Sequence, residues 1–387
     1  MSSNWLLLFI PVAIVLDWVG ANPILVFLAS ALAIVPLARL MGDATEALGE
    51  SLGPTAGGLL NATLGNAPEI IIAVFALHRG LIHVVKASIT GSIVGNLLFG
   101  LGASMFAGGL TVRYQTFDSR VAHMNGALLT LASFGLIVPA TYRIGPLAGP
   151  HTGREISLEI SVILFLIYLA SLVFTLVTQK PVVGKAGVEA DKENPGAAGS
   201  RGDELQGPGR TGVTLATATT RSGRESVAGE EKVGWSRNKA LGILAAVAIG
   251  LAIMSEILTG AIEPAATSMG LTPLFAGVFV LAPVGNGAEL LNAVRFARKD
   301  KMDLSIGITV GASTQVALLV APLLVFAGWF LGQDMNLLFS PYEMWAVIMA
   351  VFITRTLIYD GESSWLEGLM LIGIYFMLGF GFFHLPG

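Results

Sequence analysis

Two pentapeptides of one pattern, Gly-Asn-x-x-Glu, stand at residues 65–69 and 285–289, each inside an apolar stretch long enough to cross a bilayer. Their acidic side chains, Glu69 and Glu289, therefore lie at membrane depth. Burying a carboxylate there costs about 2.5–3.5 kcal/mol on insertion scales, so such groups usually face an ion pathway, a cation or a proton. Two of them in matching surroundings predict one shared site, whereas a single one can also be a structural partner for Asn or Arg.

The residues around both glutamates predict broken helices with free backbone oxygens. Pro68 has no amide hydrogen and obstructs the carbonyl of Leu64, and Gly65 lowers the helix propensity. Pro283 and Gly287 act in the same way in the second motif. Carbonyl, amide and carboxylate oxygens are the hard ligands that calcium prefers, whereas soft metals call for Cys, His or Met. The candidate metal ligands are Glu69, Glu289, Asn66, Asn286, Gly65 and Gly285.

Two carboxylates in an apolar cavity carry a charge that must be compensated. They can hold one divalent cation or take up protons, because desolvation and mutual repulsion both favour the protonated form. The cation and the protons then exclude each other from the same site. If only the loaded and the protonated forms reorient easily, this exclusion is sufficient for antiport by alternating access.

Small polar residues at helical spacing follow each motif. The first set is Ser88, Ser92 and Asn96, and the second, 217 residues later, is Ser305, Thr309 and Ser313. A spacing of four places each set on one helix face, where it either lines the site or packs against a neighbouring helix. The candidate site-lining residues are Ser92, Asn96, Ser313 and Gln315.

Two further glutamates occupy matching places ahead of the motifs. Glu46 lies seven residues before Gly53, and Glu263 lies seven residues before Gly270. Both stand at the interfacial end of an apolar segment, so they either belong to the ion pathway or are ordinary solvated carboxylates.

Composition defines the class of protein. Of the 387 residues 54% are hydrophobic and 12% are charged, against roughly a quarter charged in soluble proteins, which predicts an all-α polytopic membrane protein. The net charge of -4 gives no indication of nucleic-acid binding, and the absence of cysteine excludes disulfides and thiolate metal sites. There is no nucleotide-binding loop, so we expect no enzymatic activity and no cofactor.

Hydropathy predicts about eleven transmembrane helices in a lipid bilayer. The predicted segments are 5–19, 22–41, 54–79, 84–110, 120–140, 155–178, 238–258, 272–298, 302–332, 341–358 and 363–384. We divide them into an extra N-terminal helix (1–21), a first five-helix repeat (22–178), a polar linker of disordered composition (179–237) and a second five-helix repeat (238–387).

Charge bias predicts the orientation. Most of the 22 Lys and Arg residues fall on the side that holds the N-terminus and the linker, which should be cytoplasmic, with the C-terminus external. Because five is an odd number, the second repeat starts from the opposite membrane face and is inverted. The two glutamates can then meet near the midplane. The pattern predicts no particular oligomeric state.

The motifs resemble those of cation/proton exchangers in the calcium/cation antiporter superfamily. The residues that carry the resemblance are 57–69, 91–92 and 96–98 in the first repeat and 255–256, 262–264, 285–289 and 311–315 in the second. The resemblance covers about 35–178 and 238–384, so it leaves out the linker.

This resemblance implies export of cytosolic Ca2+ in exchange for external H+ by a ten-helix core with one added helix. It implies that Glu69 and Glu289 carry calcium or protons, and that segments 22–41 and 238–258 slide as gates. Family members often have an acidic linker, but residues 180–237 hold eight acidic and nine basic residues, so calcium regulation there is not implied. Ala312 stands where Ser is frequent, which leaves Ser313, Thr314 and Gln315 as polar contacts.

Two alternatives remain at this point. Sodium/calcium exchangers of the superfamily typically carry Thr-Ser in place of Asn66 and Asn286 and need further ligands for sodium. A gated cation channel would usually form an open pore in a symmetric oligomer, whereas an inverted repeat with broken helices suits alternating access. The lack of a long N-terminal tail favours a prokaryotic cytoplasmic membrane over an organelle.

Overall fold

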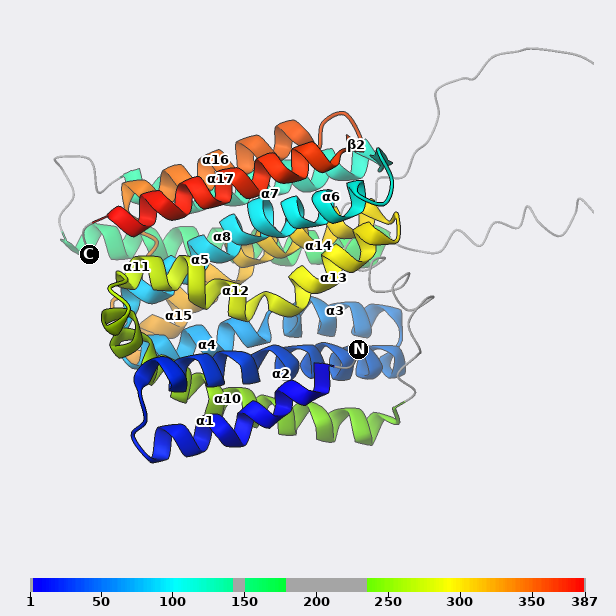
Figure 1. Ribbon diagram of the computed structural model, residues 1–387. Helices are drawn as coiled ribbons and strands as arrows, with labels where there is room; N and C mark the ends of the chain where they lie inside the picture. The colour runs from blue at the N-terminus through cyan, green and yellow to red at the C-terminus, as the bar shows by residue number, and fades with distance from the viewer. Residues whose placement is uncertain (1–2, 142–149, 179–234, 386–387) are drawn as a thin grey trace, which may run out of the picture.

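The computed structural model describes residues 3–141, 150–178 and 235–385, which form a bundle of helices lying roughly along one axis (Figure 1). The first half contains a 3-10 helix η1 (Ser3–Leu8), α1 (Phe9–Trp18), α2 (Pro23–Leu52), α3 (Pro54–Leu64), α4 (Ala67–His78), α5 (Ile82–Val94), the π-helix η2 (Gly95–Gly100), α6 (Leu101–Gly109), β1 (Gln115–Thr116), α7 (Ser119–Thr141) and α8 (Pro150–Thr178).

The second half has the same order of elements. It contains α10 (Arg237–Ser268), α11 (Pro273–Phe275), the π-helix η4 (Ala276–Leu281), α12 (Ala282–Gly285), α13 (Gly287–Arg298), α14 (Met302–Gln315), the π-helix η5 (Val316–Val320), α15 (Ala321–Leu331), α16 (Pro341–Leu357), β2 (Glu362–Ser363) and α17 (Trp365–His384). The strands β1 and β2 pair antiparallel, with Gln115 opposite Ser363.

The helices confirm the predicted class, an all-α membrane protein. In the described part of the chain, eight helices are long and apolar enough to cross a bilayer. The count becomes nine when Pro273–Gly285 and Gly287–Arg298, bent by 63°, are taken as one span. The shorter α1 and α16 coincide with the predicted segments 5–19 and 341–358. Eleven spans therefore stay a prediction, and the predicted linker 179–237 lies almost entirely outside the described residues.

Two predicted boundaries were wrong. The segments 22–41 and 238–258 were expected to end early, but α2 continues to Leu52 and α10 continues to Ser268. The polar residues that marked the predicted ends are tolerated in a helix, and no backbone feature interrupts it there. The helices end only near Gly53 (φ 88°) and Gly270 (φ 69°), where a positive φ favours glycine. Glu46 and Glu263 therefore stand inside long helices.

The two halves run in opposite directions. In Figure 1 the chain passes from α3 to α4 toward one end of the bundle and from α12 to α13 toward the other. We call these ends after residues in their turns: the Arg79 end, where α4 stops, and the Lys299 end, where α13 stops. The strands β1 and β2 lie at the Lys299 end (Figure 1).

Helix boundaries define the register between the repeats. The helices α4 and α13 begin and end 220 residues apart, the same separation as the two Gly-Asn motifs. The polar sets that sequence spacing related at 217 residues are therefore three residues out of register. At 220, Ser92 corresponds to Ala312, and the π-helices η2 and η5 begin at nearly equivalent places.

The apolar interior is divided into two main clusters. The larger one is built from α5 to α8 and α14 to α17, with part of α4. The smaller one is built mainly from α1, α2 and α10, which lie side by side at the edge of the bundle (Figure 1). The helix α4 lies at the seam, because Ala73, Ala76 and Leu77 pack in the larger cluster and Ile72 packs in the smaller one.

Candidate ion-binding site

Both motifs break their helices as predicted. The helix α3 stops at Leu64 and α4 starts at Ala67, while α12 stops at Gly285 and α13 starts at Gly287. The linking asparagines have nearly the same backbone conformation, with φ -98° and ψ 15° at Asn66 and φ -86° and ψ 1° at Asn286. Each of them occupies the N-cap position of the helix that follows.

The glutamates stand in the first turns of the two helices that follow the breaks, Glu69 in α4 and Glu289 in α13. A helix N-terminus carries a partial positive charge, which favours a carboxylate at this position. The same sequence pattern thus places one acidic group at the start of each of two helices that run in opposite directions.

The asparagine side chains do not cap these helices and instead bond to other spans. The amide nitrogen of Asn66 donates to Gln315 Oε1 at 2.5 Å. The amide nitrogen of Asn286 donates to Ser92 Oγ at 2.9 Å and to the carbonyl of Ala282 at 3.0 Å. Each motif is therefore held by a polar residue of the opposite repeat. Because the nitrogens make these bonds, the side-chain oxygens are left as candidate ligands.

The two glutamates come close to each other. They interact electrostatically, and a Cβ atom added to Gly285 would lie 3.3 Å from Glu69 Cγ, so the Glu69 side chain packs against the second motif. The Oε2 atoms of Glu69 and Glu289 are both shielded and have no hydrogen-bond partner. A buried carboxylate oxygen without a partner is costly, and a cation or a proton would remove this cost.

The remaining predicted residues are placed unevenly. Asn96 is 1% exposed on η2, and its Nδ2 atom has no hydrogen-bond partner, which agrees with a polar role. Ser313 Oγ donates to the carbonyl of Thr309 in its own helix at 2.9 Å, which favours the packing interpretation. Glu46 is partly buried in α2, whereas Glu263 is exposed on α10 and is not brought to the site.

The two directions out of the site differ in exposure. Toward the Lys299 end, Asn61 on α3 and Asn292 and Arg295 on α13 are exposed. Toward the Arg79 end, Ile72 on α4 and Val278 on η4 are buried. Polar side chains on membrane helices face water or protein in preference to lipid. The site is therefore more open toward the Lys299 end.

Sequence reasoning missed Asn292 and Arg295, although a signal was present. Both follow Glu289 at intervals of three, which places them near one face of α13 and gives an otherwise membrane-buried helix a polar side. Within the described residues no cluster of three or more acidic, His or Cys side chains occurs. A cation at this site would therefore depend on two carboxylates with amide and carbonyl oxygens.

Comparisons with known proteins agree with this arrangement. The sequence pattern of the sodium/calcium exchanger protein family matches residues 22–177 and 239–383. The chain is 41% identical to a Ca2+/H+ antiporter of Aphanothece halophytica, over 98% of this chain and 96% of the relative. It is 40% identical to a Ca2+/H+ antiporter of Synechocystis sp., with the same coverage. The solved structure of native YfkE superimposes with a TM-score of 0.77 at 31% identity, over 99% of this chain and 100% of that one.

Proposed function

The chain belongs to the sodium/calcium exchanger protein family, and from this premise we propose that it is an antiporter that exports Ca2+ in exchange for H+. It is an integral membrane protein, as its spans and its bacterial relatives indicate. The two relatives with the same coverage are both named Ca2+/H+ antiporters, which supports proton coupling over sodium coupling. Transport requires no cofactor, since calcium and protons are the cargo.

One observation carries the proposal: two glutamates from inverted broken helices each keep a buried oxygen without a hydrogen-bond partner. A Ca2+ ion bound between Glu69 and Glu289 would satisfy both oxygens at once. Protons on the two carboxyls would do the same and would remove their repulsion. Since both kinds of cargo compensate the same charge, they compete, and competition at one site couples their movements.

The amides and the broken backbone complete the proposed site. The oxygens of Asn66 and Asn286 and the backbone at Gly65 and Gly285 supply neutral ligands of the kind calcium takes at about 2.3–2.6 Å. Gln315 and Ser92 act one step further out, because they orient the asparagines through the bonds at 2.5 and 2.9 Å. Asn96 and Ser313 stand on the same spans, while Glu46 and Glu263 belong to the approach at most.

The direction of transport follows from the proposed orientation. Arg295, Arg298, Lys299 and Lys301 gather at the Lys299 end, and a bias of basic residues marks the cytoplasmic side. The exposed Asn292 lies on the same side of the site. Calcium would therefore enter from the cytoplasm through the open half and leave at the Arg79 end after the protein reorients. We place the protein in a prokaryotic cytoplasmic membrane.

The test is calcium uptake by the purified protein in sealed proteoliposomes, with a pH gradient imposed, sodium absent and the membrane potential clamped. We expect Ca2+ to accumulate against its gradient only while protons flow in the opposite direction. Uptake that depends on a sodium gradient would identify a sodium/calcium exchanger instead. Simple equilibration of Ca2+ without regard to either gradient would identify a channel, because a channel cannot drive uphill flux.

A further inference from the structure

A single arginine connects the end of α4 to the middle of α10. Arg79 directly follows α4, and its Nη2 atom donates to Glu256 Oε1 at 2.6 Å and to the Glu256 backbone carbonyl at 3.3 Å. The two side chains are 38% and 47% exposed. The contact joins residues 177 positions apart, so it reports on how two distant helices are placed against each other.

The helix α10 provides a fitted seat for this guanidinium. A Cβ atom added to Gly260, one turn after Glu256, would lie 3.1 Å from Arg79 Nη2. The absence of a side chain at this position therefore leaves the space in which the guanidinium lies. Thr259 Oγ1 donates to the same Glu256 carbonyl at 3.2 Å. A seat of this shape favours one register of α10 along α4.

The two helices belong to different packing units. The apolar residues of α10, among them Leu251, Met254 and Leu258, pack in the smaller cluster with α1 and α2. The end of α4 next to Arg79 packs in the larger cluster through Ala76 and Leu77. A displacement of α1, α2 and α10 as one body along this seam keeps the interior of each cluster intact, so the contacts across the seam decide how easily it occurs.

The helix α4 carries the proposed ion site at its other end. Glu69 stands in its first turn and Arg79 follows its last residue, so the 12-residue helix links the carboxylate to the ion pair. The ion pair lies at the end of the bundle toward which the site is closed, since Ile72, between Glu69 and Arg79, is 3% exposed. Separation of α10 from α4 at this end would uncover Ile72.

We propose that Arg79 is a positioning residue that acts through Glu256, holding α10 against α4 and keeping the ion site closed at the Arg79 end. The inference rests on the proposed alternating access. A partly exposed ion pair shifts a two-state equilibrium about two- to five-fold, which is too little to lock the protein and enough to bias it. Loss of the pair should therefore raise the share of molecules open at the Arg79 end.

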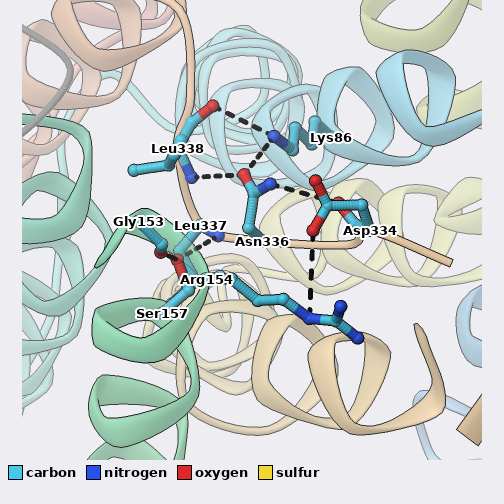
Figure 2. A network of polar contacts seen from close by, with 8 residues as sticks. All are labelled: Lys86, Gly153, Arg154, Ser157, Asp334, Asn336, Leu337 and Leu338. Carbon is cyan, nitrogen blue, oxygen red and sulfur yellow. Dashed lines mark hydrogen bonds and ion pairs between the residues drawn. The ribbon is translucent and has the colours of Figure 1, made fainter. Parts of the chain in front are cut away.

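The chain offers a matched control at the same end of the bundle. Arg154 on α8 forms an ion pair with Asp334 at 3.9 Å, also between partly exposed side chains. Figure 2 shows this pair beside Lys86, which donates to Asn336 and Leu338. Residues that flank this network, including Leu164, Leu337 and Val85, all pack in the larger cluster. The Arg154 pair thus lies within one packing unit and does not cross the seam.

The experiment uses a cysteine reporter in the full chain, which contains no native cysteine. Ile72→Cys places a buried thiol behind the proposed closure, and its rate of reaction with a water-soluble maleimide is measured on the purified protein. We expect Arg79→Gln and Glu256→Gln each to raise the rate about two- to five-fold. Arg154→Gln should leave it unchanged. Arg79→Lys, which keeps the charge, should raise it less than Arg79→Gln.

A double variant separates pairwise coupling from general loosening. Arg79→Gln with Glu256→Gln should react no faster than either single variant, because both remove the same contact. Multiplying effects in the double variant, or an equal increase with Arg154→Gln, would overturn the proposal, as would unchanged labelling in both single variants. Thermal unfolding of each variant identifies any that lose the fold. Because labelling needs no ion gradient, it can fail while Ca2+/H+ exchange succeeds, and the reverse.

Discussion

The side-chain amide of Asn66 donates a hydrogen bond of 2.5 Å to Gln315, a residue 249 positions further along the chain. Asn286 makes the related contact in the other direction, to Ser92 at 2.9 Å. Each broken helix is thus oriented by the span that follows the break in the opposite repeat. Neither half can form the site alone, and a change in one repeat is transmitted to the ion ligands of the other.

Neutralising either central glutamate should abolish exchange. Glu69→Gln and Glu289→Gln keep the side-chain shape and remove the charge that binds the cation and the proton, so calcium uptake driven by a pH gradient should vanish while the thermal unfolding temperature is retained. Glu159→Gln, on an exposed position of α8, is the control and should transport normally. Full activity in either central variant would refute the shared site.

Removing the partner of Asn66 should weaken calcium binding. Gln315→Ala leaves the amide of Asn66 without its acceptor, at a cost of about 1 kcal/mol, or roughly a five-fold loss of apparent calcium affinity. The neighbouring Thr314 bonds to the carbonyl of Val310 in its own helix, so Thr314→Val should have little effect. The concentration dependence of uptake measures both variants, and equal losses would contradict an orienting role for Gln315.

A methyl group at Gly285 should displace Glu69. The added Cβ atom would lie 3.3 Å from Glu69 Cγ, so the carboxylate must move and the rate of exchange should fall. Gly287→Ala is the matched control two residues away, because its Cβ atom would make only an ordinary contact of 3.6 Å with Val35. Initial rates of uptake distinguish the two. If Gly287→Ala is the more damaging change, the broken backbone matters more than the place of Glu69.

The close approach of α5 to η4 should make Gly91 sensitive to substitution. A Cβ atom there would lie 2.5 Å from the carbonyl oxygen and 2.6 Å from the Cα atom of Val278, so Gly91→Ala should destabilise the protein by about 1–3 kcal/mol. At Gly95, one turn later, an added Cβ atom meets nothing within 4 Å, so Gly95→Ala should be tolerated. Thermal unfolding in detergent compares the two, and similar curves would show that η4 can move away.

Local chemistry made the helix breaks predictable. Gly65 and Pro68, and Pro283 with Gly287, disrupt a helix through their own backbone properties, and the structure breaks at both places. The apolar spans and the inverted order of the repeats were also readable, because hydropathy and an odd number of helices need no tertiary information. The ends of α2 and α10 were misread because charged residues were taken as helix ends.

The sequence by itself determined that this is a membrane protein with two inverted motifs and two carboxylates at membrane depth, since insertion cost and backbone chemistry act within a single segment. Only the tertiary structure decided that Asn66 faces Gln315, that Asn286 faces Ser92 and that Arg79 reaches Glu256. It also decided the register of 220 residues between the repeats. These contacts join residues far apart along the chain, and they depend on how helices pack, which hydrophobic periodicity does not specify.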